Sequence, residues 1–459
     1  MTDGPLILWF RRDLRLSDQP MLAAAVATGR AVVPVFVLDP ETEAQGAAAR
    51  WRLGLALAAF GESLARLGVR LVLRRGAALA VLQALVAETG ASAVWWSRLY
   101  DPISKARDAA VKAGLKAGCI EARSFAGHLL HEPWAVATGA GGVFKVYTPY
   151  WNAVRVLRVE ASVAAPTALR GPGVWPVSED LPEFGRDMRR GAAVVLPYQQ
   201  VGEAAALARL AEFLERRVAD YRARRDYLAE EAASGLSENL TYGEIGPRQV
   251  WHAGWRALQD GAAGAEHFLK ELVWREFAYH LAYHSPHIVT RNWWADRDNF
   301  AWRGDNPDAE RWRRGMTGEP VVDAAMRQMY VTGTMHNRAR MVVASYLTKH
   351  LLTDWRVGQA WFAECLTDWD PASNAMGWQW VAGSGPDAAP YFRIFNPATQ
   401  AEKYDPDGLY QARWLGERGY FDAVPKAWGL EPGAPYPKPM IGLAEGRARA
   451  LAALAKSKA

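Results

Sequence analysis

Short apolar runs alternate with amphipathic stretches over the first 125 residues of the chain. Residues 6–10 (LILWF) and 31–39 (AVVPVFVLD) are continuous apolar runs, as is typical of strands buried on both faces of a sheet. Helical patterns at 20–29, 50–68 and 77–90 alternate with further strand patterns at 69–76 and 91–97. This alternation predicts an α/β domain with a doubly wound parallel sheet. No G-x-G-x-x-G fingerprint follows the first strand, so the usual Rossmann dinucleotide site is not indicated.

The pattern changes twice further along the chain. Between about 130 and 200, Pro and Gly recur and no periodicity lasts, which indicates a connecting segment. Beyond it, strand patterns almost vanish and amphipathic helices are expected at Glu203–Arg224, Ala265–His284, Pro320–Thr332, Asn337–Thr353 and Gln359–Leu366. We therefore predict an α/β domain over residues 1–130, an interdomain linker over 131–200 and an all-helical domain over 201–459.

Composition narrows the class of protein. The 459 residues suit two or three domains, and no apolar run approaches the ~18 residues of a membrane span. The N-terminus lacks the charge order of a signal peptide, so we expect a cytoplasmic protein without a membrane contact. Cys119 and Cys365 are too few for a disulfide framework or a four-thiolate cluster. The net charge of +5 favours an acidic partner such as nucleic acid, and a general richness in arginine explains it equally well.

Acids, amides and indoles gather in the C-terminal half. The stretch DWDPASNAMGWQW, Asp368 to Trp380, holds two aspartates, an asparagine and three tryptophans. Two other stretches place polar and bulky groups on one helix face at i, i+3 and i+4, namely Glu271, Trp274 and Arg275, and Asn337, Arg340 and Met341. Each face alone is typical of a salt-bridged surface, and an indole in a helical domain usually packs in the core. Together they predict a polar ligand site beside an Arg340–Asp368 pair.

Four motifs carry a resemblance to a known family. The stretches LWFRRDLRLSDQPML, ELVWREF, TGEPVVDAAMRQMYVTGTMHNRARM and GWQWVAGSGPDAAPYFRIFNP resemble the DNA photolyase/cryptochrome family, in the family's order and from about residue 6 to 415. Within it the chain is most similar to a bacterial cyclobutane pyrimidine dimer photolyase, leaning toward the third class. The resemblance implies an α/β domain, a long linker and a helical domain that holds FAD. It also implies a monomer that acts on DNA containing pyrimidine dimers, with no metal and no obligate protein partner.

The resemblance also implies roles for single residues. Around the FAD phosphates and ribitol it places Tyr221, Ser234, Gly235, Leu236, Ser237 and Arg275, with Phe268 and Glu271 also near the cofactor. Lining the flavin it places Asn337, Arg340, Asp368, Asp370 and Asn374. The pyrimidine dimer would meet Glu271, Trp274, Asn337, Met341 and Trp380. Electrons would reach the flavin through Trp302, Trp355 and Trp378, and DNA phosphates would meet Arg225, Arg338 and Arg393.

The chain departs from the family's pattern in several places. The usual T-S-R-L-S phosphate motif reads ASGLS here, so a hydroxyl and an arginine are lost; Phe268 and Thr334 stand where tryptophan is common. The stretch YDPISKARDAAV lies where antenna chromophores bind in relatives, but Ile103 and Ser104 replace the Asn-Glu pair of some folate-binding members. Methenyltetrahydrofolate is favoured there over a deazaflavin, and the absence of any antenna stays open.

Three alternative functions stay open at the level of sequence. A blue-light photoreceptor of the cryptochrome kind is the first, although Asn374 stands where plant cryptochromes commonly carry aspartate. A six-four photolyase is the second, although Met341 takes a position where that class shows histidine. The third is a basic, aromatic nucleic-acid binder without catalysis, which bound FAD would exclude.

Overall fold

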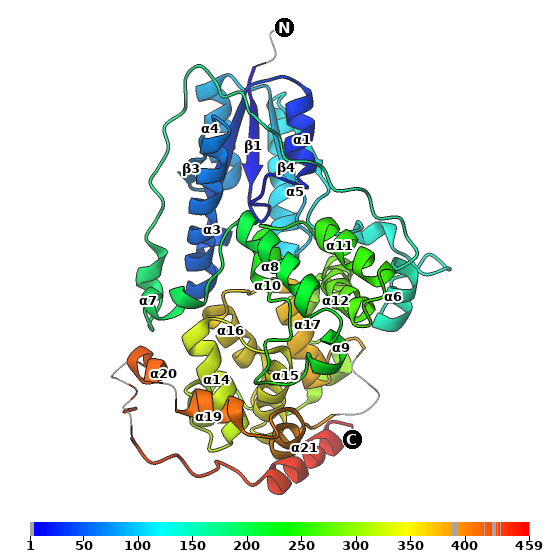
Figure 1. Ribbon diagram of the computed structural model, residues 1–459, viewed down its shortest axis with the longest axis vertical. Helices are drawn as coiled ribbons and strands as arrows, with labels where there is room; N and C mark the ends of the chain where they lie inside the picture. Colours follow the sequence, from blue (N-terminus) through cyan, green and yellow to red (C-terminus); the bar gives the residue numbers. More distant parts are fainter. Residues whose placement is uncertain are drawn as a thin grey trace.

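The computed structural model describes residues 4–387, 393–416, 418–424, 428, 430–431 and 433–458. A sheet flanked by helices forms the upper part of the molecule in Figure 1, and helices alone form the lower part. In the described part the sheet has five parallel strands in the order β3-β2-β1-β4-β5, which confirms the predicted doubly wound α/β fold. The strands are β1 (Leu6–Phe10), β2 (Val32–Leu38), β3 (Val72–Arg75), β4 (Ala93–Ser97) and β5 (Glu121–Phe125).

The continuous apolar runs are explained by burial on both sheet faces. Successive side chains of a strand point to opposite faces. Leu8 of β1 therefore packs in one hydrophobic cluster with α1 and α3, while Trp9 packs in the other with α4 and α5. Helices cover both faces, so no position of the wholly buried strands β1, β2 and β4 can be polar without cost, whereas the edge strands β3 and β5 carry charged residues. The helices of this domain are α1 (Pro20–Ala27), α2 (Pro40–Glu43), α3 (Ala47–Arg66), α4 (Ala78–Thr89) and α5 (Pro102–Ala117).

The first part of the segment 131–200 lies beside the helix Ala265–His284, and its later part runs along the outside of the sheet domain (Figure 1) and hydrogen-bonds to it. The backbone N–H of Val32 donates to the Arg170 carbonyl at 2.7 Å, and that of Glu179 donates to the Leu73 carbonyl at 2.9 Å. Two short helices, α6 (Tyr147–Val154) and α7 (Ala192–Val195), interrupt it. Neither is long enough to give a lasting periodicity, so the sequence pattern did not predict them.

The C-terminal half is helical, as predicted. The strand Leu6–Phe10 and the helices Ala265–His284 and Pro320–Thr332 have the predicted bounds. In the described residues no helix combines the length and apolar character that crossing a membrane requires. The helices are α8 (Glu203–Arg216), α9 (Tyr221–Arg224), α10 (Ser237–Tyr242), α11 (Pro247–Gln259), α12 (Ala265–His284), α13 (Pro307–Arg313), α14 (Pro320–Thr332), α15 (Asn337–Ser345), α16 (Trp355–Cys365), α17 (Pro371–Ala382), α18 (Pro397–Tyr404), α19 (Leu409–Leu415), α20 (Arg418–Ala423) and α21 (Leu443–Lys458).

Three predicted helix bounds were wrong. The helix predicted over 203–224 ends at Arg216, where the N–H groups of Arg217 and Val218 both donate to the Phe213 carbonyl. The helix predicted over 337–353 leaves α geometry at Ser345 and continues as one π-helical turn, Tyr346–His350, all of it buried. At the first break buried positions continue at helical spacing among exposed ones, and in the π-helical turn every residue is buried, so neither break interrupts the periodic signal. Helix α16 begins at Trp355 rather than at 359, because Asp354 caps it by accepting the N–H of Arg356.

Candidate functional site

Two joined cavities open among the helices of the C-terminal half. One has a volume of about 620 Å³ and lies against α12, α15 and α17. The other, of about 660 Å³, lies against the loop 228–237 and the helices α9, α14 and α19. Their shared wall residues make them one bent space, of a size that suits a large cofactor with a second ligand beside it. The residues common to both walls are Arg225, Ser237, Glu271, Asn337, Arg340 and Asp368.

The predicted pair of Arg340 and Asp368 is present in the wall. Arg340 Nη2 donates to Asp368 Oδ2 at 2.7 Å, and Arg340 Nε donates to the Met335 carbonyl at 2.9 Å. Asp368 is buried, and its second oxygen, Oδ1, has no hydrogen-bond partner within the described chain. An unpaired buried carboxylate oxygen is costly, so this atom fits a ligand that carries N–H or O–H donors.

Asp370 and Asn374 hold the start of α17 against the same cavity. Asp370 caps the helix by accepting the Ser373 N–H at 2.8 Å, and its other oxygen accepts the hydroxyl of Tyr279. Arg12, from the loop after β1, reaches Asp370 at 3.7 Å, so the α/β domain contributes to this wall. Asn374 lies one turn into the helix, and its Nδ2 donates to the Gln359 carbonyl at 3.2 Å. Tyr279 and Arg12 carried no sequence signal because only the fold brings them to Asp370.

The five residues expected to meet the lesion share one cavity wall. Glu271, Trp274, Asn337, Met341 and Trp380 all line the 620 Å³ cavity. Glu271 forms an ion pair with Arg225, and His267 approaches it at 3.7 Å. Trp274 is covered on one face by Tyr147 of α6, with ring centroids 3.7 Å apart and planes 7° apart. Tyr147 also donates its hydroxyl to the Lys270 carbonyl at 2.6 Å, so the linker fixes the orientation of Trp274.

Some of the residues predicted to lie at the phosphates and ribitol of FAD line the second cavity. Its wall includes Tyr221, Ser234, Gly235, Leu236 and Ser237. Phe268 is not in either described wall; it packs behind Tyr221, with ring centroids 6.1 Å apart, because it points into the core. Arg275 lines only the other cavity, where Nη1 donates to the His128 carbonyl at 2.9 Å. A phosphate contact for Arg275 therefore lacks support from this geometry.

The three tryptophans of the expected relay differ in depth. Trp378 of α17 is buried and lines the cavity. Trp355 is fully buried at the start of α16, and its indole N–H donates to Asn292 Oδ1 at 2.9 Å. Trp302 is half-buried against Phe300, with ring centroids 4.2 Å apart. Trp378 is thus the one of the three at the cavity and Trp302 the one nearest the surface, and their role as a relay stays a prediction.

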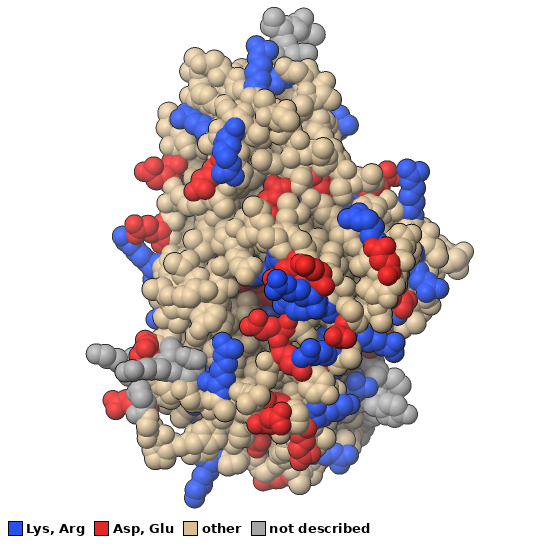
Figure 2. Space-filling model, viewed as in Figure 1, with Lys and Arg blue, Asp and Glu red and all other residues tan. Residues whose placement is uncertain are grey.

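The three arginines expected to contact DNA differ in their exposure and in their pairing with carboxylates. Arg225 is largely buried against Glu271, and Arg338 Nη2 donates to Asp226 at 2.6 Å. Arg393 is exposed, with its guanidinium 5.8 Å from the ring of Trp380 at the cavity. Figure 2 shows acidic and basic side chains intermixed on one face, most densely over the middle and lower parts. That face is therefore not uniformly basic. Of the three arginines Arg393 is the most exposed, and this makes it the best placed for a phosphate.

A buried acid beside the site gives a pH prediction. Glu276 accepts the N–H of Leu130 at 2.8 Å, and burial raises its pKa to about 7 although Arg275 opposes the shift. A raised pKa in the folded state means that stability falls as pH rises from the unfolded value of about 4.3 through 7. The loss amounts to roughly 4 kcal/mol at about 1.4 kcal/mol per pKa unit.

We therefore expect Glu276→Gln to flatten the dependence of unfolding free energy on pH between 5 and 8. Urea unfolding at a series of pH values measures this. Glu266→Gln, on the exposed side of the same helix, is the matched control and should keep the wild-type slope. An unchanged slope in Glu276→Gln would contradict the assignment.

Comparisons with known proteins agree with the fold and the cavity. Residues 6–167 match the family model of DNA photolyase, and residues 268–456 match that of the FAD binding domain of DNA photolyase. The deoxyribodipyrimidine photo-lyase of Agrobacterium fabrum is 45% identical over 99% of this chain and 98% of its own length. Cryptochrome-1 of Arabidopsis thaliana is 35% identical over 99% of this chain and 70% of its own. A bacterial class III photolyase from Agrobacterium tumefaciens superposes with a TM-score of 0.91 and 44% identity, covering 100% of this chain and 98% of that one. The chain belongs to the DNA photolyase/cryptochrome family.

Proposed function

We propose that the chain is a light-dependent lyase that uses reduced FAD to split cyclobutane pyrimidine dimers in DNA. The observation that carries this proposal is the shared wall: Trp274 and Trp380 line the same cavity as Arg340, Asp368 and Asn374. Its support from relatives is that the photo-lyase of Agrobacterium fabrum matches over nearly the whole chain. The lesion and the cofactor would then lie close together in one cavity. Electron transfer between them requires such a short distance.

The residues of the wall fit FAD. Asp368 Oδ1 offers an unpaired buried acceptor, Arg340 a partly buried cation, and Ser234 and Ser237 hydroxyls for the ribitol and phosphates. When bound, reduced FAD supplies the light-excited electron donor. Asn374 lies on the cavity wall, and its amide is oriented by the hydrogen bond to the Gln359 carbonyl. With the flavin in this cavity, Asn374 would lie beside the flavin ring.

The lesion-side residues divide the work of binding. A dimer must leave the duplex stack to be reached, and the indoles of Trp274 and Trp380 offer flat apolar faces to hold it. Glu271, as the ion-pair partner of Arg225, acts as an acceptor and suits a ring N–H of the pyrimidine. Asn337 of the same wall supplies an amide donor for a carbonyl oxygen, where negative charge develops as the bonds split.

Blue-light repair of a defined oligonucleotide tests the proposal. The purified, prereduced protein is given single-lesion strands carrying either a cyclobutane dimer or a six-four product, in light and in darkness. We expect only the cyclobutane dimer to be repaired, and only in light. Repair of the six-four product alone identifies that class instead. Flavin binding with no repair of either lesion overturns the enzyme and favours a photoreceptor.

An antenna chromophore belongs to the same proposal, with methenyltetrahydrofolate favoured. The stretch 100–111 forms the start of α5, where Asp101 caps the helix and Ile103 is exposed. Arg107 is held by Asp39 at 2.8 Å and by Asp108 at 3.0 Å, so this cation is already engaged. Acid extraction of the purified protein, followed by absorption and fluorescence spectra, distinguishes a folate, a deazaflavin and neither.

DNA binding should depend on salt through Arg393. Each phosphate contact contributes about −0.9 to the slope of log K against log salt concentration on duplex DNA. We expect Arg393→Ala to flatten that slope by roughly one unit, measured by fluorescence anisotropy with a dimer-containing duplex. The control is Arg186→Ala, whose side chain is 82% exposed in the linker segment and should leave the slope unaltered. Equal slopes for wild type and Arg393→Ala would rule out this contact.

A further inference from the structure

The loop of residues 233–237, ASGLS, lines the 660 Å³ cavity without a cation of its own. The two phosphates of a dinucleotide need positive charge or several N–H donors close by. Ser234 and Ser237 supply hydroxyls only. A cation for this end of the cavity has to come from another element.

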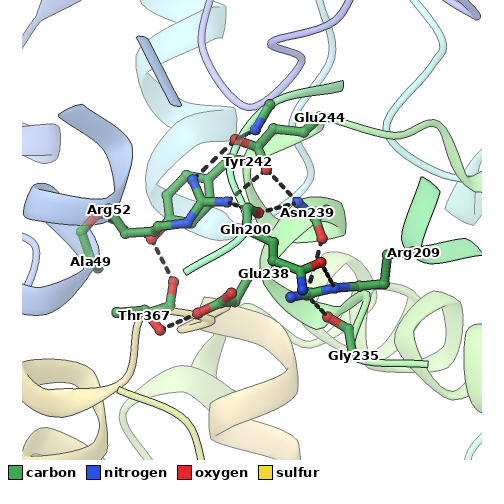
Figure 3. A network of polar contacts seen from close by, with 11 residues as sticks. Ala49, Arg52, Gln200, Arg209, Gly235, Glu238, Asn239, Tyr242, Glu244 and Thr367 are labelled. Atoms are coloured by element: carbon green, nitrogen blue, oxygen red, sulfur yellow. Dashed lines mark hydrogen bonds and ion pairs between the residues drawn. The ribbon is translucent and has the colours of Figure 1, made fainter. Parts of the chain in front are cut away.

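Arg209 of α8 brings a guanidinium to this loop. Figure 3 shows its side chain extending to Gly235. Nη1 donates to the Gly235 carbonyl and, at 3.3 Å, to Asn239 Oδ1, while Nε donates to Gln200 Oε1 at 2.9 Å. Nη2 has no hydrogen-bond partner among the described residues, and Arg209 itself lines the cavity. One face of the guanidinium is thus fixed by protein and one nitrogen is left for a ligand.

The charge of Arg209 is not neutralised by a carboxylate contact. Its three hydrogen-bond partners are a glutamine, an asparagine and a backbone carbonyl, all uncharged. Two other arginines of the wall, Arg225 and Arg340, are paired with Glu271 and Asp368. Arg413 has no carboxylate partner in the described chain, but it lies on α19 with its guanidinium 4.8 Å from the Trp414 ring. Arg209 is the unpaired cation that contacts the loop.

Gly235 is the position that admits this arrangement. Its φ is +66°, a left-handed conformation that side chains other than glycine's adopt at a cost. A Cβ there would lie 3.4 Å from both Cδ and Nη1 of Arg209. Arg209 therefore occupies the space into which a side chain at 235 would project, and the loop and α8 fit as one unit.

A buried network fixes the guanidinium from behind (Figure 3). Asn239 Nδ2 donates to Glu244 Oε2 at 2.6 Å, which orients its Oδ1 toward Arg209. Glu244 is in turn held by Arg52 of α3, at 3.0 and 2.7 Å, and both side chains are fully buried. Arg52 of the α/β domain thus sets the position of Arg209 through Glu244 and then Asn239. Arg52 and Glu244 are positioning residues.

We infer that Arg209 binds the pyrophosphate of FAD, in place of the cation that residues 233–237 lack. This inference rests on the proposed function, because it takes FAD as the occupant of the cavity. A charge-assisted hydrogen bond contributes enough that its loss weakens binding by about 10- to 100-fold. The effect should depend on the phosphates and not on the isoalloxazine ring.

Titration of the apoprotein with two flavins tests the inference. FAD carries the pyrophosphate and riboflavin has none, so each variant is titrated with both, by quenching of flavin fluorescence. We expect Arg209→Gln to raise the Kd for FAD by about 10- to 100-fold and to leave that for riboflavin unchanged. Arg209→Lys should restore part of the FAD affinity, since it keeps the charge but not the fork of donors. Arg216→Gln, at the exposed end of the same helix α8 and outside both cavity walls, is the matched control and should bind FAD nearly as the wild type does.

The outcomes separate this inference from the proposed function. If the wild-type apoprotein binds no FAD, the proposed function fails and Arg209 has no role to explain. If the wild type binds FAD and Arg209→Gln binds it equally well, only the role of Arg209 is overturned. An equal loss in Arg209→Gln and Arg216→Gln, or a parallel loss of riboflavin binding, also overturns it, because a general charge effect or a distorted cavity then suffices.

Discussion

Replacing Glu271 with alanine is expected to lower the repair yield per absorbed photon by on the order of 10-fold or more, while FAD stays bound. Glu271 lies in the wall shared by both cavities, held by the guanidinium of Arg225. Removing one partner of a hydrogen bond to a charged group typically costs about 1.5–3 kcal/mol, and here the lost bond would be the one that holds the dimer's ring N–H in position. Single-turnover flashes on prereduced protein, with counted photons and a dimer-containing strand, measure this yield.

The ion pair complicates a simple reading of that variant, because Arg225 loses its partner when Glu271 is shortened. Arg225→Ala and the double variant complete a double-mutant cycle, which isolates the coupling between the two side chains. We expect the double variant to be no worse than Glu271→Ala, since the charge of Arg225 is then no longer left unpaired. Wild-type yield in Glu271→Ala would exclude a role in repair, and lost FAD in that variant would make it a cofactor residue instead.

The candidate site was predictable where its residues share one helix face. Glu271, Trp274 and Arg275 stand at i, i+3 and i+4 on α12, and helix geometry alone requires them to project together. The pairing of Arg340 with Asp368 also followed from sequence, because a buried acid needs a cation and the two stretches both pointed to a ligand. Helix periodicity is local information, and it survives whatever the tertiary fold does.

Contacts between elements far apart in sequence were not predictable. Tyr147 covers Trp274 from a segment that has no periodicity, and Arg209 reaches Gly235 from a helix whose charged positions look like an ordinary solvated face. Arg275 and Phe268 show the reverse case: Arg275 was expected at the phosphates and Phe268 near the cofactor, but Arg275 turns to His128 and Phe268 into the core. The direction of a side chain around its helix depends on which neighbour the helix packs against, and spacing along the chain does not contain that.

The bounds of the elements failed for a related reason. The hydrophobic spacing runs unbroken from α8 into α9, since Phe213 and Tyr221 on either side of the break, and Val218 within it, are all buried. After Ser345 the chain is buried all round, and Thr348, Lys349 and His350 are buried with their apolar neighbours, so the polarity pattern does not mark the π-helical turn. Strand β1 had the predicted bounds because charged residues, Arg11 and Arg12, follow its apolar run at once. The end of a helix or strand can be predicted where the sequence changes sharply from apolar to charged. It cannot be predicted where the residues on both sides of the end are equally buried.

Replacing Trp378 with phenylalanine is expected to abolish photoreduction of oxidised FAD by an external reductant and to spare repair by prereduced protein. Of the three tryptophans expected to form the relay, Trp378 lines the cavity, and its ring lies against Gly358 of α16, where an added Cβ would come within 2.0 Å of the indole. Trp355 stands on the same face of α16, one turn earlier. The segment that carries Trp302 pairs with the start of this helix, since the N–H of Asp354 donates to the Arg303 carbonyl at 2.8 Å.

Phenylalanine keeps most of the packing at position 378 but is far harder to oxidise than tryptophan. The fold should therefore survive with a modest cavity cost, and only electron transfer should stop. Bleaching of the oxidised flavin absorbance under blue light, with a thiol reductant, follows the rate. Trp251→Phe, a buried tryptophan of α11 stacked on Trp255, controls for the loss of an indole elsewhere and should photoreduce normally. Photoreduction of Trp378→Phe at the wild-type rate would mean that electrons enter by another route. Failure of the prereduced variant to repair would instead place Trp378 in the repair step itself.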